Sequence, residues 1–116
     1  MKIRIKDNSV RLRLTQSEVN TLSKQGIISS KTEFIGRPFI YNIEKTDDLE
    51  LSAVFIDNEI VLKMPAKMIE EWISTDIVGF TGRTGLVSLL VEKDFVCIDN
   101  TDEDQSDNYP NPNIKC

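Results

Sequence analysis

The chain carries one residue pattern twice, fifty positions apart. Residues 3–14 align with residues 53–64, and this alignment places Asp7-Asn8 on Asp57-Asn58. Two copies of one supersecondary unit are the simplest explanation of such a repeat. The repeat constrains the fold more strongly than any other feature, because the second copy is expected to form the same elements as the first.

The correspondence extends beyond this first segment. Ile27-Ile28 falls on Ile77-Val78 in the same register. After a slip of two positions, Ile43-Glu44-Lys45 matches Val91-Glu92-Lys93. The repeat therefore covers almost the whole chain up to the last twenty residues.

Each copy is predicted to open with a β-hairpin. Apolar and basic residues alternate along Lys2–Lys6 and Ser9–Leu14, as in strands with one buried face. Between these strands, Asp7-Asn8 suits a two-residue turn in which both central residues have positive φ. The same pattern surrounds Asp57-Asn58 in the second copy.

A helix and two more strands are expected after each hairpin. In the first copy, Thr15 and Glu18 have the spacing of a capping box, and Gly26 suits a left-handed helix end. The second helix is predicted to begin at Pro65. It is expected to bury one stripe of side chains, Met68, Ile69, Trp72 and Ile73. The later strands are expected at residues 27–34, 38–45, 76–81 and 85–91.

These elements predict an α+β domain built from two ββαββ repeats, residues 1–48 and 49–96. The strands are expected to form a mainly antiparallel curved sheet or a small barrel that carries two helices. A rough two-fold axis would relate the copies. The domain is predicted to occupy residues 1–98, followed at 99–116 by an acidic tail that is either disordered or laid on the domain.

Composition limits the chemistry of the chain. Its 116 residues carry a formal net charge of −5 and include no histidine, which removes the commonest general base and the usual catalytic triads. No apolar run approaches the roughly 18 residues of a membrane-spanning helix. We expect a cytoplasmic protein that uses no membrane, cofactor or catalytic residue and acts by binding.

Charge is divided between two parts of the chain. Residues 1–13 carry five basic side chains and one acidic one, whereas residues 98–107 carry five acidic side chains and no basic one. A two-residue turn would place four of the cations on one face of the first hairpin. We call this set the basic hairpin: Lys2, Arg4, Arg11 and Arg13. The opposite face is predicted to enter the core through Ile3, Ile5, Val10, Leu12 and Leu14.

Arg4 is expected directly opposite Arg11, and like charges in that position destabilise an antiparallel strand pair. The second copy has Val54 and Val61 at these places, so the fold does not require arginine there. We therefore expect an acidic counterpart for the basic hairpin. The plain alternative is a solvated charged face that protects a sheet edge against aggregation.

Two counterparts fit this expectation. The first is an external phosphate, polyphosphate or nucleic acid, which arginine side chains bind well. Nucleic acid is the weaker version, because no aromatic residues are interleaved with the cations. The second is the chain's own tail, present at high effective concentration, through Asp102, Glu103, Asp104 and Asp107. If the face is only solvated, a protein partner of the tail is the remaining option.

The tail carboxylates could also offer oxygen ligands to Ca²⁺ or Mg²⁺. Their spacing does not fit an EF-hand loop, and we predict no metal site. Cys97 is expected to be a small buried residue that ends the last strand, and Cys116 a free thiol. A disulfide between them is not expected in a reducing cytosol.

Both ends of the chain resemble a family of short bacterial proteins of unknown function. The resemblance rests on the opening hairpin and on two segments near the C-terminus, residues 92–98 and 103–112. It covers nearly the whole chain and implies a cytosolic bacterial protein of this size. It implies no activity.

A weaker likeness is to the triphosphate-tunnel hydrolases, which also have a Leu-Thr-x-x-Glu helix start, here Leu14, Thr15 and Glu18. It implies an alternative function, a divergent metal-dependent phosphohydrolase that holds a triphosphate on the basic hairpin and Mg²⁺ on the tail acids. The metal-binding glutamates of that family's first strand are replaced here by the basic strand Lys2–Lys6.

Overall fold

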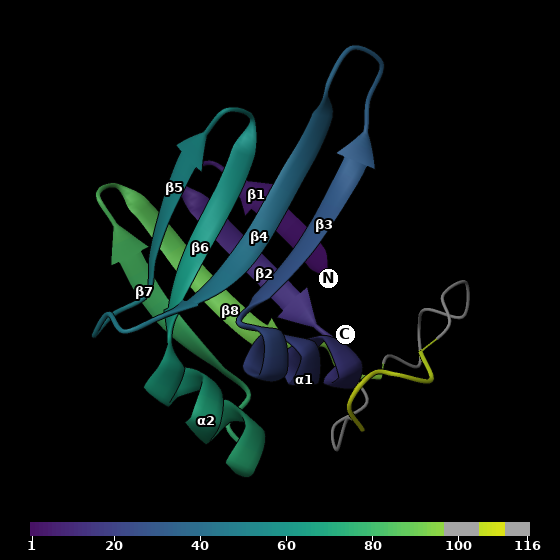
Figure 1. Ribbon diagram of the computed structural model, residues 1–116, viewed down its shortest axis with the longest axis vertical. Helices are drawn as coiled ribbons and strands as arrows, with labels where there is room; N and C mark the ends of the chain where they lie inside the picture. Colours follow the sequence, from purple (N-terminus) through teal and green to yellow (C-terminus); the bar gives the residue numbers. More distant parts are fainter. Residues whose placement is uncertain (97–104, 111–116) are drawn as a thin grey trace.

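The computed structural model describes residues 1–96 and 105–110. Within them the order ββαββ occurs twice (Figure 1). The first copy contains β1 (Lys2–Lys6), β2 (Ser9–Leu14), α1 (Gln16–Gln25), β3 (Ile27–Glu33) and β4 (Pro38–Thr46). The second copy contains β5 (Ser52–Ile56), β6 (Glu59–Pro65), α2 (Ala66–Ser74), β7 (Gly79–Thr84) and β8 (Val87–Lys93). Neither of these helices is long and apolar enough to cross a membrane.

Turn chemistry explains the two opening hairpins. Each turns over two residues, as predicted. In the second hairpin, φ is positive at both Asp57 (53°) and Asn58 (66°). In the first, φ is positive at Asp7 (49°) but not at Asn8, so the two turns differ in type.

Helix ends also follow the sequence signals. The Glu18 carboxylate accepts a hydrogen bond from the Thr15 amide at 2.9 Å, which is one half of the predicted capping box. Gly26 ends α1 in the left-handed conformation, with φ of 81°. Pro65 is the N-cap of α2, so this helix begins one residue later than predicted, at Ala66.

The eight strands of the described residues form two four-stranded sheets. The first sheet has the order β1-β2-β8-β7, and the second has the order β3-β4-β6-β5. Hairpin strands are antiparallel, whereas the central pairs, β2 with β8 and β4 with β6, are parallel. Each sheet therefore joins the opening hairpin of one copy to the closing hairpin of the other. The α+β class is confirmed, and its strands form two mixed sheets, not a closed barrel.

The two parallel junctions have equivalent registers. Leu12 pairs with Val91 in the first sheet, and Leu62 pairs with Ile43 in the second. These two pairings are equivalent, because the repeat aligns Leu12 with Leu62 and, after the two-residue slip, Ile43 with Val91. The repeat in the sequence is therefore also a repeat in strand pairing.

One part of the predicted alignment is wrong. In the first copy, Ile27 pairs with Glu44. The equivalent of Glu44 in the second copy is Glu92, and Glu92 pairs with Gly79 and not with Ile77. The reason is the longer connection between α2 and β7, which moves β7 and β8 to 79–84 and 87–93 instead of 76–81 and 85–91.

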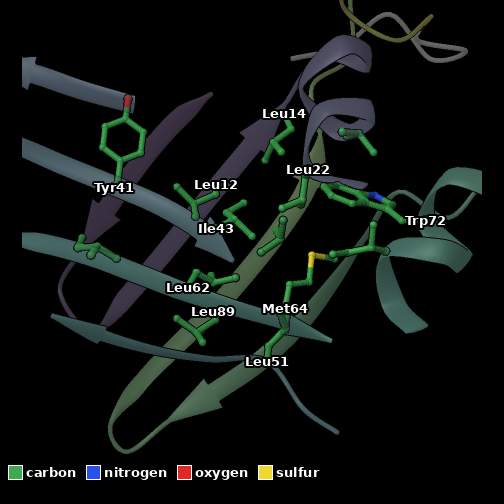
Figure 2. Packing of buried hydrophobic residues seen from close by; sticks show 14 residues of the cluster. Leu12, Leu14, Leu22, Tyr41, Ile43, Leu51, Leu62, Met64, Trp72 and Leu89 are labelled. Atoms are coloured by element: carbon green, nitrogen blue, oxygen red, sulfur yellow. The ribbon is translucent and has the colours of Figure 1, made fainter. Parts of the chain in front are cut away.

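The core lies between the two sheets (Figure 2), and the helices cover the end of the sheets at which β2 and β6 finish (Figure 1). Trp72 of α2 is fully buried, and its Nε1 donates to the carbonyl oxygen of Val78 at 3.0 Å. Ile69 is also buried, but Ile73 is 42% exposed. The buried stripe of α2 is therefore narrower than predicted. Ile5 is 53% exposed, near the turn end of its hairpin, and so does not enter the core as predicted.

Candidate functional site

One face of the first sheet collects basic side chains. Directly paired residues of neighbouring strands point to the same side of a sheet, so the registers define rows of side chains. The outward rows are first Lys2, Arg13, Glu92 and Gly79; second Arg4, Arg11, Leu90 and Thr81; third Lys6, Ser9, Ser88 and Arg83. We call the six cations of these rows the outer basic face: Lys2, Arg4, Lys6, Arg11, Arg13 and Arg83.

The acidic counterpart of the basic hairpin comes from β8 and the residue after it. Arg13 Nε donates to Glu92 Oε1 at 2.8 Å, and Arg11 Nε lies 3.6 Å from the same oxygen. Lys2 Nζ pairs with Asp94 Oδ2 at 2.9 Å. Both carboxylates are mostly buried, so the first row of the face is held in place by internal ion pairs.

The remaining cations have no such counterpart. Arg4, Lys6 and Arg83 are exposed, and no carboxylate of residues 1–96 or 105–110 forms an ion pair with any of them. Arg4 lies directly opposite Arg11, as predicted. Arg83 Nε donates to the carbonyl oxygen of Gly85 at 3.3 Å, which leaves the rest of its guanidinium available to solvent. The unneutralised charge therefore lies in the second and third rows.

The equivalent face of the second sheet is different. Its middle row has Val54 and Val61 where the first sheet has Arg4 and Arg11. Two lysines and two glutamates balance in its three equivalent rows, namely Lys31, Lys63, Glu44 and Glu59. Since both sheets have the same strand order and registers, the basic face is a property of these side chains and not a requirement of the fold.

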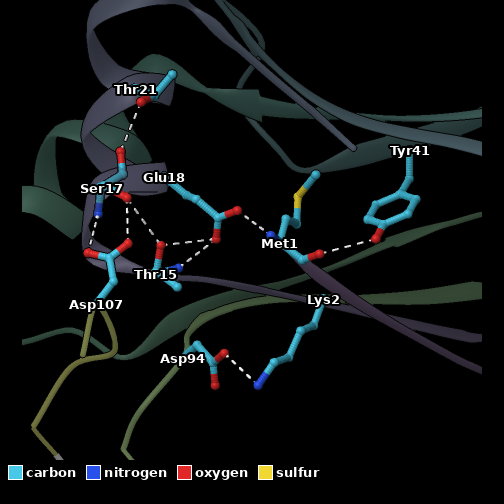
Figure 3. Close-up of polar contacts among 9 residues, drawn as sticks. All are labelled: Met1, Lys2, Thr15, Ser17, Glu18, Thr21, Tyr41, Asp94 and Asp107. Atoms are coloured by element: carbon cyan, nitrogen blue, oxygen red, sulfur yellow. Dashed lines mark hydrogen bonds and ion pairs between the residues drawn. The ribbon is translucent and has the colours of Figure 1, made fainter. Parts of the chain in front are cut away.

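Asp107, the one predicted tail acid among the described residues, makes a different contact from the predicted one (Figure 3). Asp107 lies at the start of α1, where its backbone carbonyl accepts from Gln16 N at 3.1 Å and its Oδ1 from Ser17 N at 3.3 Å. Hydrogen bonds from the side chains of Ser17 and Thr15 hold the pKa of Asp107 below its usual value. This tail acid therefore caps a helix and forms no ion pair with the basic hairpin. Asp102, Glu103 and Asp104 lie outside the described residues.

The segment around Asp107 is held on the domain by further contacts. Tyr109 N donates to Asp94 O at 2.8 Å, and Val96 N donates to Tyr109 O at 2.7 Å. The Tyr109 ring lies 5.9 Å from that of Phe95 and beneath Lys93 Nζ, 5.0 Å away. Burial, followed by the charge of Asp107, raises the pKa of Tyr109. Residues 105–110 are therefore laid on the domain.

The contacts of the buried Lys93 are explained by the fold. Its Nζ donates to the carbonyl oxygen of Thr75 at the end of α2, at 3.0 Å. Its equivalent in the first copy, Lys45, donates in the same way to Ser23 near the end of α1. Burial lowers the pKa of Lys93, and the nearby Asp76 partly opposes this. Because both copies use the lysine to cap a helix, Lys93 needs no catalytic explanation.

A hollow of about 440 Å³ lies beside the open end of the basic hairpin and the first turn of α1. Lys2 and Arg13 line it, but so do the carboxylates of Glu18, Asp94 and Asp107. The Glu18 carboxylate also pairs with the Met1 amino group (Figure 3). These opposite charges offset one another, so this hollow does not suit an anion, in contrast to the second and third rows of the outer basic face.

The acidic side chains and the cysteines that the sequence singles out fall only partly within the described residues. Among them, no group of three or more acidic, cysteine or histidine side chains could hold a metal ion. Cys97 and Cys116 lie outside the part of the chain that the structure describes. Sequence reasoning did not assign Lys6, Arg83, Glu92 and Asp94 to the site. Arg83, Glu92 and Asp94 reach the basic hairpin only through the pairing of β8 with β2.

Residues 1–113 match a family of unknown function (DUF7009). No curated protein and no solved structure matches the chain.

Proposed function

The chain belongs to this family of unknown function, and we propose that it is a non-enzymatic binding module, cytoplasmic and bacterial, whose outer basic face holds a phosphate-type anion. One observation carries the proposal. Arg4 lies opposite Arg11 without a carboxylate of its own among the described residues, whereas Val54 lies opposite Val61 in the equivalent sheet. A bound anion would offset the repulsion that this arrangement creates.

The chemistry of the face favours a compact oxyanion with several charges. Guanidinium groups donate paired hydrogen bonds that match phosphate oxygens, and Arg4, Arg11 and Arg83 present three of them on one sheet. The outward rows contain no aromatic side chain on which a base could stack. A chain with a net charge of −5 also repels a long polyanion. Phosphate or polyphosphate therefore fits better than nucleic acid.

Thermal melting with tripolyphosphate at low and moderate salt tests this proposal. At a free ligand concentration ten times Kd, binding stabilises the folded chain by about 1.4 kcal/mol. The double variant Arg4→Val/Arg11→Val introduces the residues that the second copy already has at these places, and it should lose the stabilisation. Lys31→Val/Lys63→Val is the matched control, because it removes two cations from the equivalent face of the second sheet. Loss of the response in the control alone would contradict the proposal.

Two further measurements with tripolyphosphate test the remaining alternatives. If the tail competes for the face, replacing Asp102, Glu103 and Asp104 with asparagine should increase the affinity for tripolyphosphate. Release of phosphate from tripolyphosphate that requires both Mg²⁺ and these acids would instead favour the divergent phosphohydrolase. If tripolyphosphate stabilises neither the natural chain nor the tail variant, the face is a solvated surface and the proposal is wrong.

A further inference from the structure

A second hollow, of about 330 Å³, lies between the two sheets at the end away from the helices. It begins beside the turn of the β1–β2 hairpin, whereas α1 follows the opposite end of β2. Eleven of the described residues line it; nine of these are apolar, and the two polar ones are Asp7 and Thr84. Its volume is at the lower end of the range for small-molecule sites, which is about 300–1,000 Å³.

The hollow results from particular side chains. Ala53 lines it, and the residue in the same position of the first copy is the larger Ile3. Val87 also lines it, and its equivalent in the first copy is Phe39. Since the fold accommodates Ile3 and Phe39, larger residues could have filled this space. The second copy leaves it open.

The mouth of the hollow is apolar and reaches solvent. Phe55 is 64% exposed and Ile5 is 53% exposed, and both line the hollow. These two residues are equivalents in the two copies and come from opposite sheets. An apolar molecule seated between them would remove this surface from water, which is the main driving force for binding a hydrocarbon.

The two polar lining residues differ in what they can offer a ligand. Thr84 Oγ1 already accepts a hydrogen bond from Ala53 N at 2.9 Å and so holds β5 against β7. Among the described residues that line the hollow, Asp7 is the one with a charge. No cation of the described residues forms an ion pair with it, and the neighbouring Lys6 belongs to the outer face. The charge that this hollow can complement is therefore positive.

We propose that the hollow binds a small amphiphilic amine. Its apolar body, the size of one short alkyl chain or one ring, would lie between the sheets. Its protonated nitrogen would lie at Asp7. This site is separate from the outer basic face, from which it differs in the sign of the charge that it attracts, so the inference does not depend on the proposed function.

Three probes with one chain length and different head groups test the inference: octylammonium and octanoate below their micelle concentrations, and octanol below its solubility limit. Binding is followed by amide chemical shifts of the full chain. Octylammonium should bind roughly two- to fivefold more tightly than octanol, as expected for one partly exposed charge pair. Octanoate should bind most weakly. Equal or tighter binding of octanoate would overturn the proposal.

Variants taken from the repeat provide matched controls. Asp7→Asn should remove the difference between octylammonium and octanol, because asparagine tolerates the positive φ of this turn but carries no charge. Asp57→Asn changes the equivalent carboxylate, which does not line the hollow, and should leave the difference unchanged. An unchanged preference in Asp7→Asn would contradict the assignment of the nitrogen to Asp7.

Filling the hollow tests its location. Ala53→Ile and Val87→Phe each introduce the residue of the other copy, and each should weaken all three probes at least tenfold while the chain stays folded. Two variants are used so that one that fails to fold does not decide the question. If both folded variants bind octylammonium like the natural chain, the site lies elsewhere. Sedimentation that shows a dimer, dissociated by these substitutions and indifferent to octylammonium, would identify a second copy as the occupant instead.

Discussion

Arg13 donates to Glu92 at 2.8 Å across the parallel junction between β2 and β8. In the second sheet a lysine and a glutamate occupy the equivalent positions, since Lys63 lies opposite Glu44 in the register of β6 and β4. In the first sheet the glutamate also lies 3.6 Å from Arg11 Nε. Glu92 therefore has two effects: it joins the opening hairpin of one copy to the closing hairpin of the other, and it lowers the charge of the outer basic face.

Glu92→Gln should destabilise the chain by about 1 kcal/mol, because it weakens a charge-assisted hydrogen bond from Arg13 and removes an ion pair with Arg11, both of which are partly exposed. Urea denaturation measures this loss. The same substitution should increase the affinity for tripolyphosphate, since the three strand rows of the face lose the one acidic residue that they contain. Glu44→Gln is the control on the second sheet and should leave anion affinity unchanged. A stable Glu92→Gln variant with unaltered affinity would show that this glutamate has neither effect.

In the absence of anion, Arg4→Val/Arg11→Val should stabilise the chain by a few tenths of a kcal/mol or more, because it removes like charges from directly opposed positions. The reverse exchange, Val54→Arg/Val61→Arg, should destabilise it by a similar amount. Both changes are measured by thermal melting at low salt, and both should shrink as salt is added. Opposite signs would mean that Arg4 and Arg11 contribute more through packing than through charge.

Gly79→Ala and Gly85→Ala should destabilise for different reasons. A Cβ on Gly79 would lie 2.1 Å from the carbonyl oxygen of Val91, so β7 and β8 would have to move apart at a cost of more than about 2 kcal/mol. A Cβ on Gly85 meets nothing within 4 Å, but its φ of +58° is unfavourable for alanine by roughly 1 kcal/mol. Gly85→Asn should recover part of that loss, whereas Gly79→Asn should not. Equilibrium unfolding of the four variants tests the ranking.

Attachment of residues 105–110 should depend on pH through Asp107. Its pKa is below the ordinary value of 3.8 in the folded chain, so its stabilising contribution is complete above pH 3.8 and is lost as pH falls through the lowered pKa. The amide resonances of Ser17 and Val96 report the attachment, because both groups donate to this segment.

Asp107→Asn should remove that acid transition from both resonances. It should also bring the pKa of Tyr109 closer to its usual value, since the charge of Asp107 contributes to raising it. As the pKa of Tyr109 is raised, its own contribution to stability is complete below pH 10 and declines as pH rises above 10. A Val96 resonance that still titrates near the lowered pKa in Asp107→Asn would assign the transition to another group.

Part of the candidate site can be predicted from local sequence. Alternation of residue types and a two-residue turn suffice to place Arg4 opposite Arg11 and Lys2 opposite Arg13. The acidic counterpart of the basic hairpin cannot be predicted in this way. The expectation that tail carboxylates supply it is not met by Asp107, because that residue caps α1. Glu92 of β8 and Asp94, the second residue after Glu92, pair with the cations instead.

The sequence by itself determined the hairpins, the helix ends and the repeat. Turn residues, capping residues and hydrophobic period act over a few positions, so their effect does not depend on the rest of the chain. Only the tertiary structure decided which hairpins share a sheet. Each hairpin has one apolar face, and such a face specifies burial but not a neighbour. The exchange of hairpins between copies placed Glu92 beside Arg13 and added Arg83 to the basic face. It also brought residues of both copies around the hollow, which stays open because Ala53 is smaller than its equivalent, Ile3.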